Sequence, residues 1–302
     1  MKKIFILLAS LMSFNLILFA KPIISVSIPP QAFFVKKIAG DFAEINVIVP
    51  PNTDEHNIDF KPATISKLEK SDIYFTTGLE FEKPMMHKFQ SLFKHLEIVD
   101  LRKNIKLLGF AEHSHEAHSH KKHEHQNDEN PSAHHEAHSH AHESSDPHIW
   151  LDPILVKTQA STIANTLSAK YPQERVKFQT NLEKFNKELD ALNVKIAALL
   201  KDKAGKKFIV YHPSWGYFAA RYNLVQIPVE LEGKEPKARD LKALIEMAKK
   251  EKIKTIFVQK GFAQNAARAL TKELDAQVLE IDHLSADWEN ELLKSAEILS
   301  KN

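Results

Sequence analysis

The stretch "IISVSIPPQAFFVKKIAGDFAEINVIVP", residues 23–50, changes its apolar pattern twice. It begins with a short β-rich run (23–28), continues with apolar residues three to four apart (30–40) and ends in a second β-rich run (44–50). Apolar spacing of three to four is typical of one face of a helix, whereas short runs rich in valine and isoleucine are typical of buried strands. The stretch therefore predicts a strand–helix–strand unit of a mostly parallel sheet.

The same alternation continues to residue 101 and returns after residue 205. Predicted strands lie at 72–78, 96–101, 206–212, 224–230, 254–259 and 276–282, and predicted helices at 61–70, 82–95, 236–251 and 263–274. Strands that alternate with helices predict α/β structure with helices on both faces of each sheet. We expect two similar lobes of this kind.

A long helical pattern separates the two lobes and begins near Pro172. Its apolar residues follow spacings of four and three: Phe178, Leu182, Phe185, Leu189, Leu192, Ile196 and Leu199. A helix of about 28 residues would span ~42 Å, which suits a rigid rod that packs along both lobes; the alternative is a helix of the second lobe alone. The predicted organisation is an N-terminal lobe (21–171), a connecting helix (172–204) and a C-terminal lobe (205–302).

The first twenty residues form a separate segment. Lys2 and Lys3 precede an apolar run from Ile4 to Phe19 that stops at Ala20. This pattern is typical of a secretory signal peptide, which we expect to be cleaved near Ala20; a membrane anchor is the alternative, although the run is short for a span of ~20 residues. We expect a periplasmic protein.

Composition limits the functions that the chain can have. It has 302 residues and no cysteine, which excludes disulfides and thiolate metal sites. Without Lys2 and Lys3, the 41 basic residues become 39, equal to the 39 acidic ones. A neutral mature chain gives no electrostatic reason to bind nucleic acid.

Histidine is the unusual residue of this sequence. Eleven of the 17 histidines stand in a polar insert between Ala111 and Glu143, and they are His113, His115, His118, His120, His123, His125, His134, His135, His138, His140 and His142. The insert has few apolar residues and no periodicity, which predicts a disordered loop (111–145). We interpret these histidines as accessory, weak metal donors; a solvated insert without a metal role is the alternative.

A fixed site is predicted elsewhere, at the carboxyl ends of the strands. His56 comes soon after the predicted strand 44–50, His212 and Asp282 stand at the carboxyl ends of the predicted strands 206–212 and 276–282, and His148 lies in "SSDPHIWLDP" (144–153), a turn that leads into helical sequence. Ligands of open α/β sheets bind in the crevice at this edge. Three imidazoles and a carboxylate can satisfy a tetrahedral zinc ion.

Four motifs of the chain resemble a known family. They are "NTDEHNIDFKPATISKLEKSDIYFTTGLEFE" (52–82), "SSDPHIWLDP" (144–153), "IVYHPSWGYFAARYNL" (209–224) and the region from "KEPKARDLKALIEMAKKEKIKTIFVQKGF" to "LDAQVLEIDHL" (234–284). In this order, and with a histidine-rich insert before the second motif, they resemble the metal-binding periplasmic proteins of ABC importers, of the ZnuA type. The likeness covers nearly the whole mature chain.

The resemblance implies zinc ligands residue by residue. It implies that His56, His148 and His212 bind Zn²⁺ in a cleft between the lobes and that Asp282 supplies a carboxylate, with Glu55 or water as the alternative fourth ligand. Manganese-binding members tend to carry a carboxylate in place of the third histidine, so His212 favours zinc over manganese. "EIDHL" lacks the Asp-Pro-Leu-Gly turn common in the family, and His283 could orient Asp282 there.

The predicted function is that of a zinc carrier. We expect the chain to be a monomeric, non-enzymatic component of a high-affinity ABC-type zinc importer that hands Zn²⁺ to a membrane permease. The alternatives are a zinc hydrolase with an open three-histidine site, a manganese-binding importer component and a surface adhesin. The sequence offers no His-Glu-x-x-His or Gly-x-Ser-x-Gly motif in support of the hydrolase.

Overall fold

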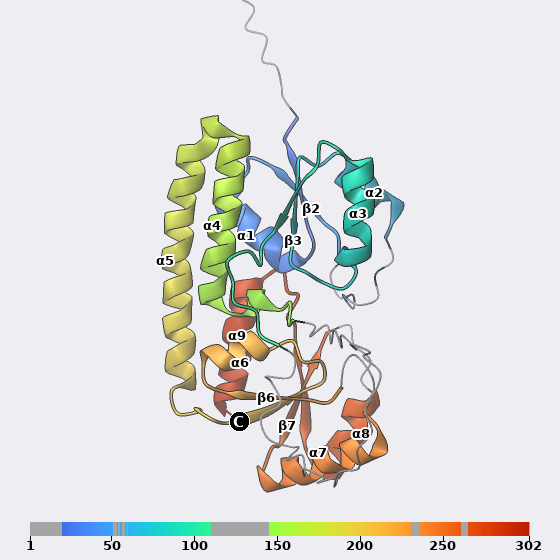
Figure 1. Ribbon diagram of the computed structural model, residues 1–302. Coiled ribbons are helices and arrows are strands. Elements are labelled where there is room, and N and C mark those ends of the chain that lie inside the picture. Colours follow the sequence, from blue (N-terminus) through green and yellow to red (C-terminus); the bar gives the residue numbers. More distant parts are fainter. Residues whose placement is uncertain are drawn as a thin grey trace, which may run out of the picture.

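The computed structural model describes residues 20–50, 53, 55, 58, 60–109, 145–230, 236–260 and 265–301, and the structural statements below concern these. Figure 1 shows two α/β lobes, one above the other, with long helices along one side of both. The predicted fold class, two similar lobes with parallel sheets and a long helix that joins them, is confirmed.

The N-terminal lobe is a parallel sheet in the order β2-β1-β3-β4. Its strands are β1 (Ile23–Val26), β2 (Glu44–Val47), β3 (Ile73–Thr76) and β4 (Glu97–Asp100), and its helices are α1 (Pro29–Ala39), α2 (Pro62–Glu69) and α3 (Glu82–Leu92). Successive side chains of β3 point to opposite faces, as in any strand. Tyr74 packs with residues of α2 and α3, whereas Ile73 and Phe75 join the main core beside α1.

The C-terminal lobe repeats this topology in the order β6-β5-β7-β8, again all parallel. Its strands are β5 (Lys207–Val210), β6 (Val225–Pro228), β7 (Thr255–Gln259) and β8 (Gln277–Ile281), and its helices are α6 (Gly216–Arg221), α7 (Ala238–Lys250) and α8 (Asn265–Leu274). Both lobes turn the carboxyl ends of their strands toward the junction between them (Figure 1).

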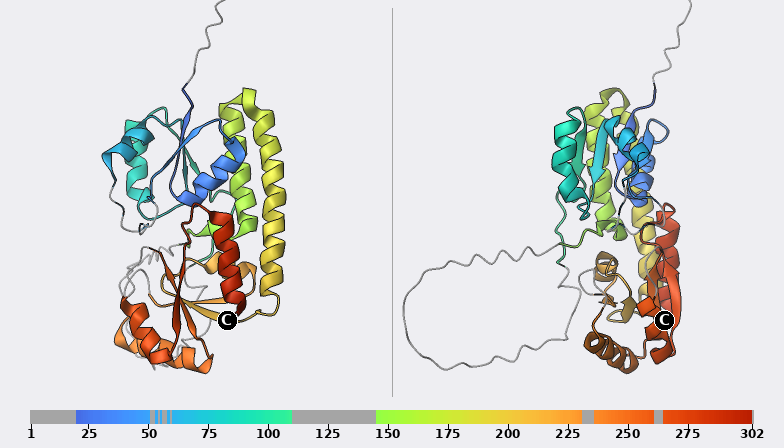
Figure 2. Two further views of the ribbon diagram at one scale, coloured as in Figure 1. Left: turned by 180° about the vertical axis from the view of Figure 1, so that it is seen from behind. Right: turned by 90° about the vertical axis from the view of Figure 1, so that its right-hand side faces the viewer.

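Three long helices connect the lobes: α4 (Pro153–Lys170), α5 (Arg175–Leu200) and α9 (Trp288–Lys301). The 26-residue helix α5 contacts α1, α4 and α9, and Figure 2 shows α4 beside the upper part of α5 and α9 beside its lower part. The connecting helix predicted from near Pro172 is thus present, after a short 3-10 turn at Pro172–Glu174. Trp288, at the start of α9, packs edge-on against Phe34 of α1, with ring centroids 5.0 Å apart.

One hydrophobic core runs through both lobes. It extends from Ile24 of β1, through the buried seam of α5, to Leu299 of α9. Two smaller clusters lie under α2 and α3 and under α7 and α8, on the opposite face of each sheet. The junction between the lobes is therefore packed along its helical side.

The two segments that flank the histidine-rich insert, before residue 110 and after residue 144, pair with each other and form the base of the insert. Gly109 and Ser145 form an antiparallel bridge, and the Asp146 amide donates to the Leu108 carbonyl at 2.8 Å. The Tyr217 hydroxyl accepts from the Leu108 amide (3.0 Å) and donates to the Asp146 carbonyl (2.9 Å). The insert itself, residues 110–144, lies outside the described residues, as does the predicted signal peptide up to residue 19.

Among the residues that the structure describes, no helix has the length and apolar character that crossing a membrane requires.

Candidate metal centre

Four segments of the chain bring titratable side chains to one buried place between the lobes. Glu55 comes from the connection between β2 and α2, and His148 lies just before a 3-10 turn (η2, Ile149–Leu151). His212 follows β5, and His283 follows β8. The strand ends of both lobes therefore contribute to it, as expected for ligand sites of open parallel sheets.

These side chains are close enough to share an ion. Glu55 Oε1 lies 2.7 Å from His283 Nε2 and 3.6 Å from His148 Nε2. The ligand atoms of Glu55, His148 and His283 all lie within 4.8 Å of one another, which suits a single metal ion. The ring of His212 is centred 5.3 Å from that of His148 and 6.3 Å from that of His283.

The cluster is withdrawn from solvent. Glu55 and His148 are 0% exposed, His283 is 1% exposed and His212 is 3% exposed. Glu55 Oε2 and His148 Nε2 have no hydrogen-bond partner among the described residues. Buried polar atoms in native proteins are nearly always satisfied, and a cation would satisfy both of these atoms.

Carboxylates behind two of the imidazoles orient them. Asp146 Oδ1 lies 2.6 Å from His148 Nδ1 and also accepts from the His148 amide at 2.8 Å. Glu230 is bonded in the same way to Nδ1 of His212. A carboxylate at Nδ1 leaves Nε2 as the atom that faces a metal and makes that nitrogen a stronger donor.

The carboxylates and imidazoles of the cluster stabilise each other's charged forms. Burial alone would raise the pKa of Glu55, but the imidazoles, His283 foremost, hold that pKa well below its usual range. Burial alone would lower the pKa of His148, whereas Asp146 and Glu55 together raise it to about 9. Three carboxylates thus surround the imidazoles and favour positive charge at this place.

The structure brings together some of the predicted ligands. His148 lies in the cluster with Glu55, which the sequence offered as an alternative fourth ligand, and His212 lies beside them. His56 and the eleven histidines of the insert lie outside the described residues. The assignment of individual zinc ligands stays a prediction.

Asp282 and His283 are arranged differently from the expectation. The Asp282 carboxylate accepts from the Leu284 amide at 3.1 Å, and it does not belong to the group of donor atoms formed by Glu55, His148 and His283. Its pKa is raised, mainly by burial. The chain turns directly after β8, and in this turn His283 enters the cluster while Asp282 accepts from the Leu284 amide.

Sequence reasoning gave His283 a supporting role and did not place it among the donors. The signal available was that His283 directly follows a residue already placed at the site. Its carbonyl accepts from the Trp150 indole at 2.7 Å, and the Trp150 carbonyl accepts from the Trp288 indole at 2.8 Å. The buried Trp150 therefore connects the loop of His283 with the segment that carries His148.

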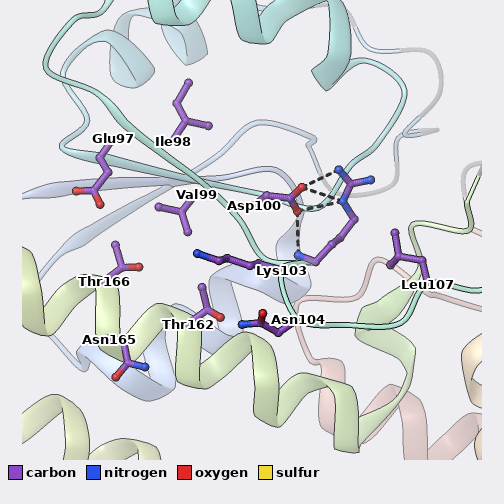
Figure 3. Close-up of a pocket in the computed structure, with 11 residues that line it drawn as sticks. Glu97, Ile98, Val99, Asp100, Lys103, Asn104, Leu107, Thr162, Asn165 and Thr166 are labelled. Atoms are coloured by element: carbon purple, nitrogen blue, oxygen red, sulfur yellow. Dashed lines mark hydrogen bonds and ion pairs between the residues drawn. The ribbon is translucent and has the colours of Figure 1, made fainter.

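A separate groove of about 810 Å³ lies beside β4 and α4. Figure 3 shows Lys103 extending toward the α4 residues Thr162 and Thr166, with Asp100 paired to the Arg102 guanidinium. The groove is lined by none of the clustered histidines. It therefore forms no part of the candidate metal centre.

Comparisons with known proteins show which family the chain resembles. Residues 24–296 match the family model for ZnuA, described as "Zinc-uptake complex component A periplasmic". The zinc-binding lipoprotein AdcA of Streptococcus pneumoniae is 28% identical over 284 residues, which are 90% of this chain and 53% of that protein. The high-affinity zinc uptake system protein ZnuA of Bacillus subtilis is 27% identical over 279 residues, 90% of this chain and 82% of that protein. The chain thus spans about half the length of the streptococcal relatives that it matches.

Solved structures add the three-dimensional comparison. A crystal structure of ZnuA is 35% identical, with a TM-score of 0.80, and the match covers 93% of this chain and 99% of that one. A ZnuA deletion mutant with zinc bound is 36% identical, with a TM-score of 0.79, over 93% and 97% of the two chains. The family match, the shared fold and the buried histidine–glutamate cluster lead to one conclusion: this chain belongs to the ZnuA family of zinc-uptake components.

Proposed function

We propose that this chain is the periplasmic zinc-binding component of a high-affinity ABC-type zinc importer. In this role it captures Zn²⁺ between its lobes as a monomer and delivers the ion to a membrane permease. The observation that carries the proposal is the buried cluster of Glu55, His148 and His283, with His212 beside it, at the strand ends of both lobes.

The donor chemistry of this cluster favours zinc over manganese. Imidazole nitrogen suits zinc and other late transition metals, whereas manganese prefers sites made mostly of oxygen. A carboxylate that stays ionised next to several imidazoles compensates part of the charge of a divalent ion. The zinc-bound ZnuA mutant and the zinc-binding relatives support the same choice.

The site is better suited to binding and transporting zinc than to zinc-dependent catalysis. A catalytic zinc keeps an open position that substrate and water can reach. Here the donor side chains are at most 3% exposed, and Glu55, which could serve as a base, is bonded to His283. We expect stoichiometric zinc binding without turnover of ester or peptide substrates.

The proposal is tested by zinc affinity and by growth. His148→Ala should lower the zinc affinity of the mature protein at least tenfold, measured by competition with a chelator, because it removes a buried donor. The same variant should fail to restore growth in zinc-poor medium to a strain that lacks the protein. His95→Ala is the matched control, since His95 is exposed and its ring is hydrogen-bonded to the Glu69 carbonyl, away from the cluster. Unchanged affinity in His148→Ala would refute the proposed site.

Zinc affinity should also depend on pH. A protonated imidazole has no lone pair for a metal, so zinc must compete with protons at each histidine donor. Because the pKa of His148 is raised to about 9, a proton already competes with zinc there at neutral pH. Affinity should therefore fall as the pH is lowered from about 9, and keep falling from about pH 7 to pH 5. A flat affinity profile in chelator competition would exclude histidine ligation.

We further propose that the histidine-rich insert collects zinc weakly for the main site. A deletion of residues 111–143 would keep the base at Gly109 and Ser145, where the two ends already pair. The shortened chain should retain one tightly held zinc ion by elemental analysis, lose the weaker ones and support less uptake from zinc-poor medium. Unchanged stoichiometry and uptake would show that the insert has no such role.

A further inference from the structure

We propose that His283 is itself a donor to the bound zinc ion, so that the loop after β8 contributes a nitrogen atom where the sequence predicts the carboxylate of Asp282. This inference rests on the proposed function, because it assumes that the cluster between the lobes is the zinc site. It concerns which atoms of this chain hold the ion.

The first support is the geometry of the donor atoms. A tetrahedral zinc ion with bonds of about 2.1 Å holds neighbouring donors ~3.4 Å apart. Glu55 Oε1 lies 3.6 Å from His148 Nε2, close to that spacing, and 2.7 Å from His283 Nε2. An ion between these atoms would require Glu55 and His283 to separate by less than about 1 Å. Asp282 does not belong to this group of donors.

The second support is the way in which the loop is held. The Asp282 amide donates to Glu291 Oε1 at 3.0 Å, and the Asp282 carboxylate accepts from the Leu284 amide. The backbone amide and one carboxylate oxygen, Oδ1, of Asp282 are therefore engaged within the C-terminal lobe. Turning Asp282 Oδ1 toward a metal would break its bond with the Leu284 amide, whereas His283 already faces the cluster.

The third support is the fixed orientation of His283. Trp150 donates to the His283 carbonyl, and the two rings lie nearly parallel, with an interplanar angle of 22° and centroids 6.5 Å apart. Because His283 is buried and its backbone is fixed, little freedom remains to be lost when a metal binds. A donor that is oriented in advance binds more tightly than a mobile one.

The consequence is a site richer in nitrogen than one completed by Asp282. With His283 as a donor, the three groups of the cluster offer two imidazoles and one carboxylate, beside the imidazole of His212. Such a set favours zinc and cobalt over manganese. His283 would thus contribute to metal selectivity as well as to affinity.

The experiment separates a donor from a residue that merely holds Glu55. His283→Gln can still donate a hydrogen bond to Glu55, but its amide is a poor zinc donor. The full mature protein is loaded with Co²⁺ at half an equivalent, so that the tightest site fills first. The visible absorption of cobalt reports its coordination, and chelator competition gives the zinc affinity of the same samples.

The donor role predicts at least a tenfold loss of zinc affinity in His283→Gln and a changed cobalt spectrum. Asp282→Asn, the matched control, keeps an oxygen for the Leu284 amide and should bind zinc within about threefold of the parent. A smaller loss in His283→Gln, or an unchanged cobalt spectrum, would overturn the inference and leave His283 as a positioning residue of Glu55. A loss in Asp282→Asn as large as that in His283→Gln would also overturn it.

Two further measurements keep this outcome interpretable. Thermal unfolding of each metal-free variant shows whether it is folded, and His283→Asp, which returns a carboxylate to the loop, should bind manganese better relative to zinc than the parent does. If His148→Ala binds zinc normally, the proposed function fails together with the inference. If His148→Ala loses zinc while His283→Gln keeps it, the inference alone fails.

Discussion

Glu230 shows how a residue that need not touch the metal can control it. Its carboxylate binds Nδ1 of His212 and thereby fixes which ring nitrogen faces the cluster. Glu230→Gln keeps the size of the side chain but removes its charge, and it should lower zinc affinity about 10- to 100-fold. Chelator competition measures this loss. Gln259, which accepts from the His212 amide, holds the backbone at the same place, so a normal circular dichroism spectrum is expected.

Glu82 offers a test that does not involve the metal site. This buried carboxylate accepts from the Thr77 amide at 3.0 Å and from the Gly78 amide at 2.5 Å. Burial raises its pKa, and the hydrogen bonds, the one from Ser27 foremost, only partly oppose this.

The sign of the pH dependence follows from that shift. Because the folded pKa of Glu82 exceeds the unfolded one, its contribution to the free energy of unfolding is largest below the unfolded pKa and falls as pH rises through the folded pKa. Glu82→Gln lacks this titration. The difference in unfolding free energy, parent minus Glu82→Gln, should therefore decrease as pH rises from about 4 to 7 in urea titrations. A difference that grows over this range would contradict the assignment.

Individual site residues were predictable where a histidine directly follows a strand. His212 comes right after a short run of apolar residues, and the prediction brought it near His148, where the structure has it. That His283, and not Asp282, lies beside Glu55 and His148 was not predictable in this way. It depends on which of two adjacent side chains the turn at Leu284 and Glu291 turns inward, and those contacts form only in the folded chain.

At the scale of elements, the loop between β3 and α3 requires a glycine. Gly78 has φ = +83°, a left-handed conformation that costs other residues about 1–2 kcal/mol, and a Cβ there would lie 2.0 Å from Nη1 of Arg102. Gly78→Ala should therefore lower the free energy of unfolding by about 1–3 kcal/mol, as measured by urea titration.

A second substitution separates the two causes of this loss. Arg102→Ala removes the guanidinium that the new Cβ would meet, although it also removes the ion pair with Asp100. In the Arg102→Ala background, Gly78→Ala should cost less than in the parent, yet still about 1 kcal/mol from the positive φ. An equal cost in both backgrounds would show that the steric contact is unimportant.

The elements themselves were predicted well where their period is clear. The strands of both lobes lie inside the predicted ranges because each is a short apolar run between turn residues. Helix α9 was not predicted: the stretch after residue 282 begins with polar residues, and its apolar face is recognised only when Trp288 meets Phe34 of the other lobe. Whether such a segment forms a helix depends on its tertiary contacts.

At the scale of the whole molecule, the lobes share a core and should unfold together. Leu189 of α5 is buried in the cluster that reaches from β1 to α9. Leu189→Ala should lower the free energy of unfolding by about 2–5 kcal/mol and leave a single calorimetric transition. Val194, on the exposed face of the same helix, is the matched control, and Val194→Ala should change that free energy by less than about 0.5 kcal/mol. Two separate transitions would contradict a shared core.

The overall arrangement could be inferred from the repeated strand–helix pattern and from the length of the helix after Pro172. The hydrophobic core that both lobes share could not be inferred, because the sequence does not show that α9 of one lobe packs on α1 of the other. The domain boundaries remain a prediction at the level of single residues.

The paired base of the histidine-rich insert has a consequence for how such chains diversify. Gly109 and Ser145 are paired, and the Tyr217 hydroxyl of the C-terminal lobe bonds to the segments on both sides of the insert. Any sequence inserted between Gly109 and Ser145 therefore begins and ends at the same place. The entropic cost of closing such a loop grows only slowly with the length of the loop. Evolution can therefore lengthen, shorten or replace the insert without changes in the two lobes. For the same reason a fluorescent protein could be inserted there.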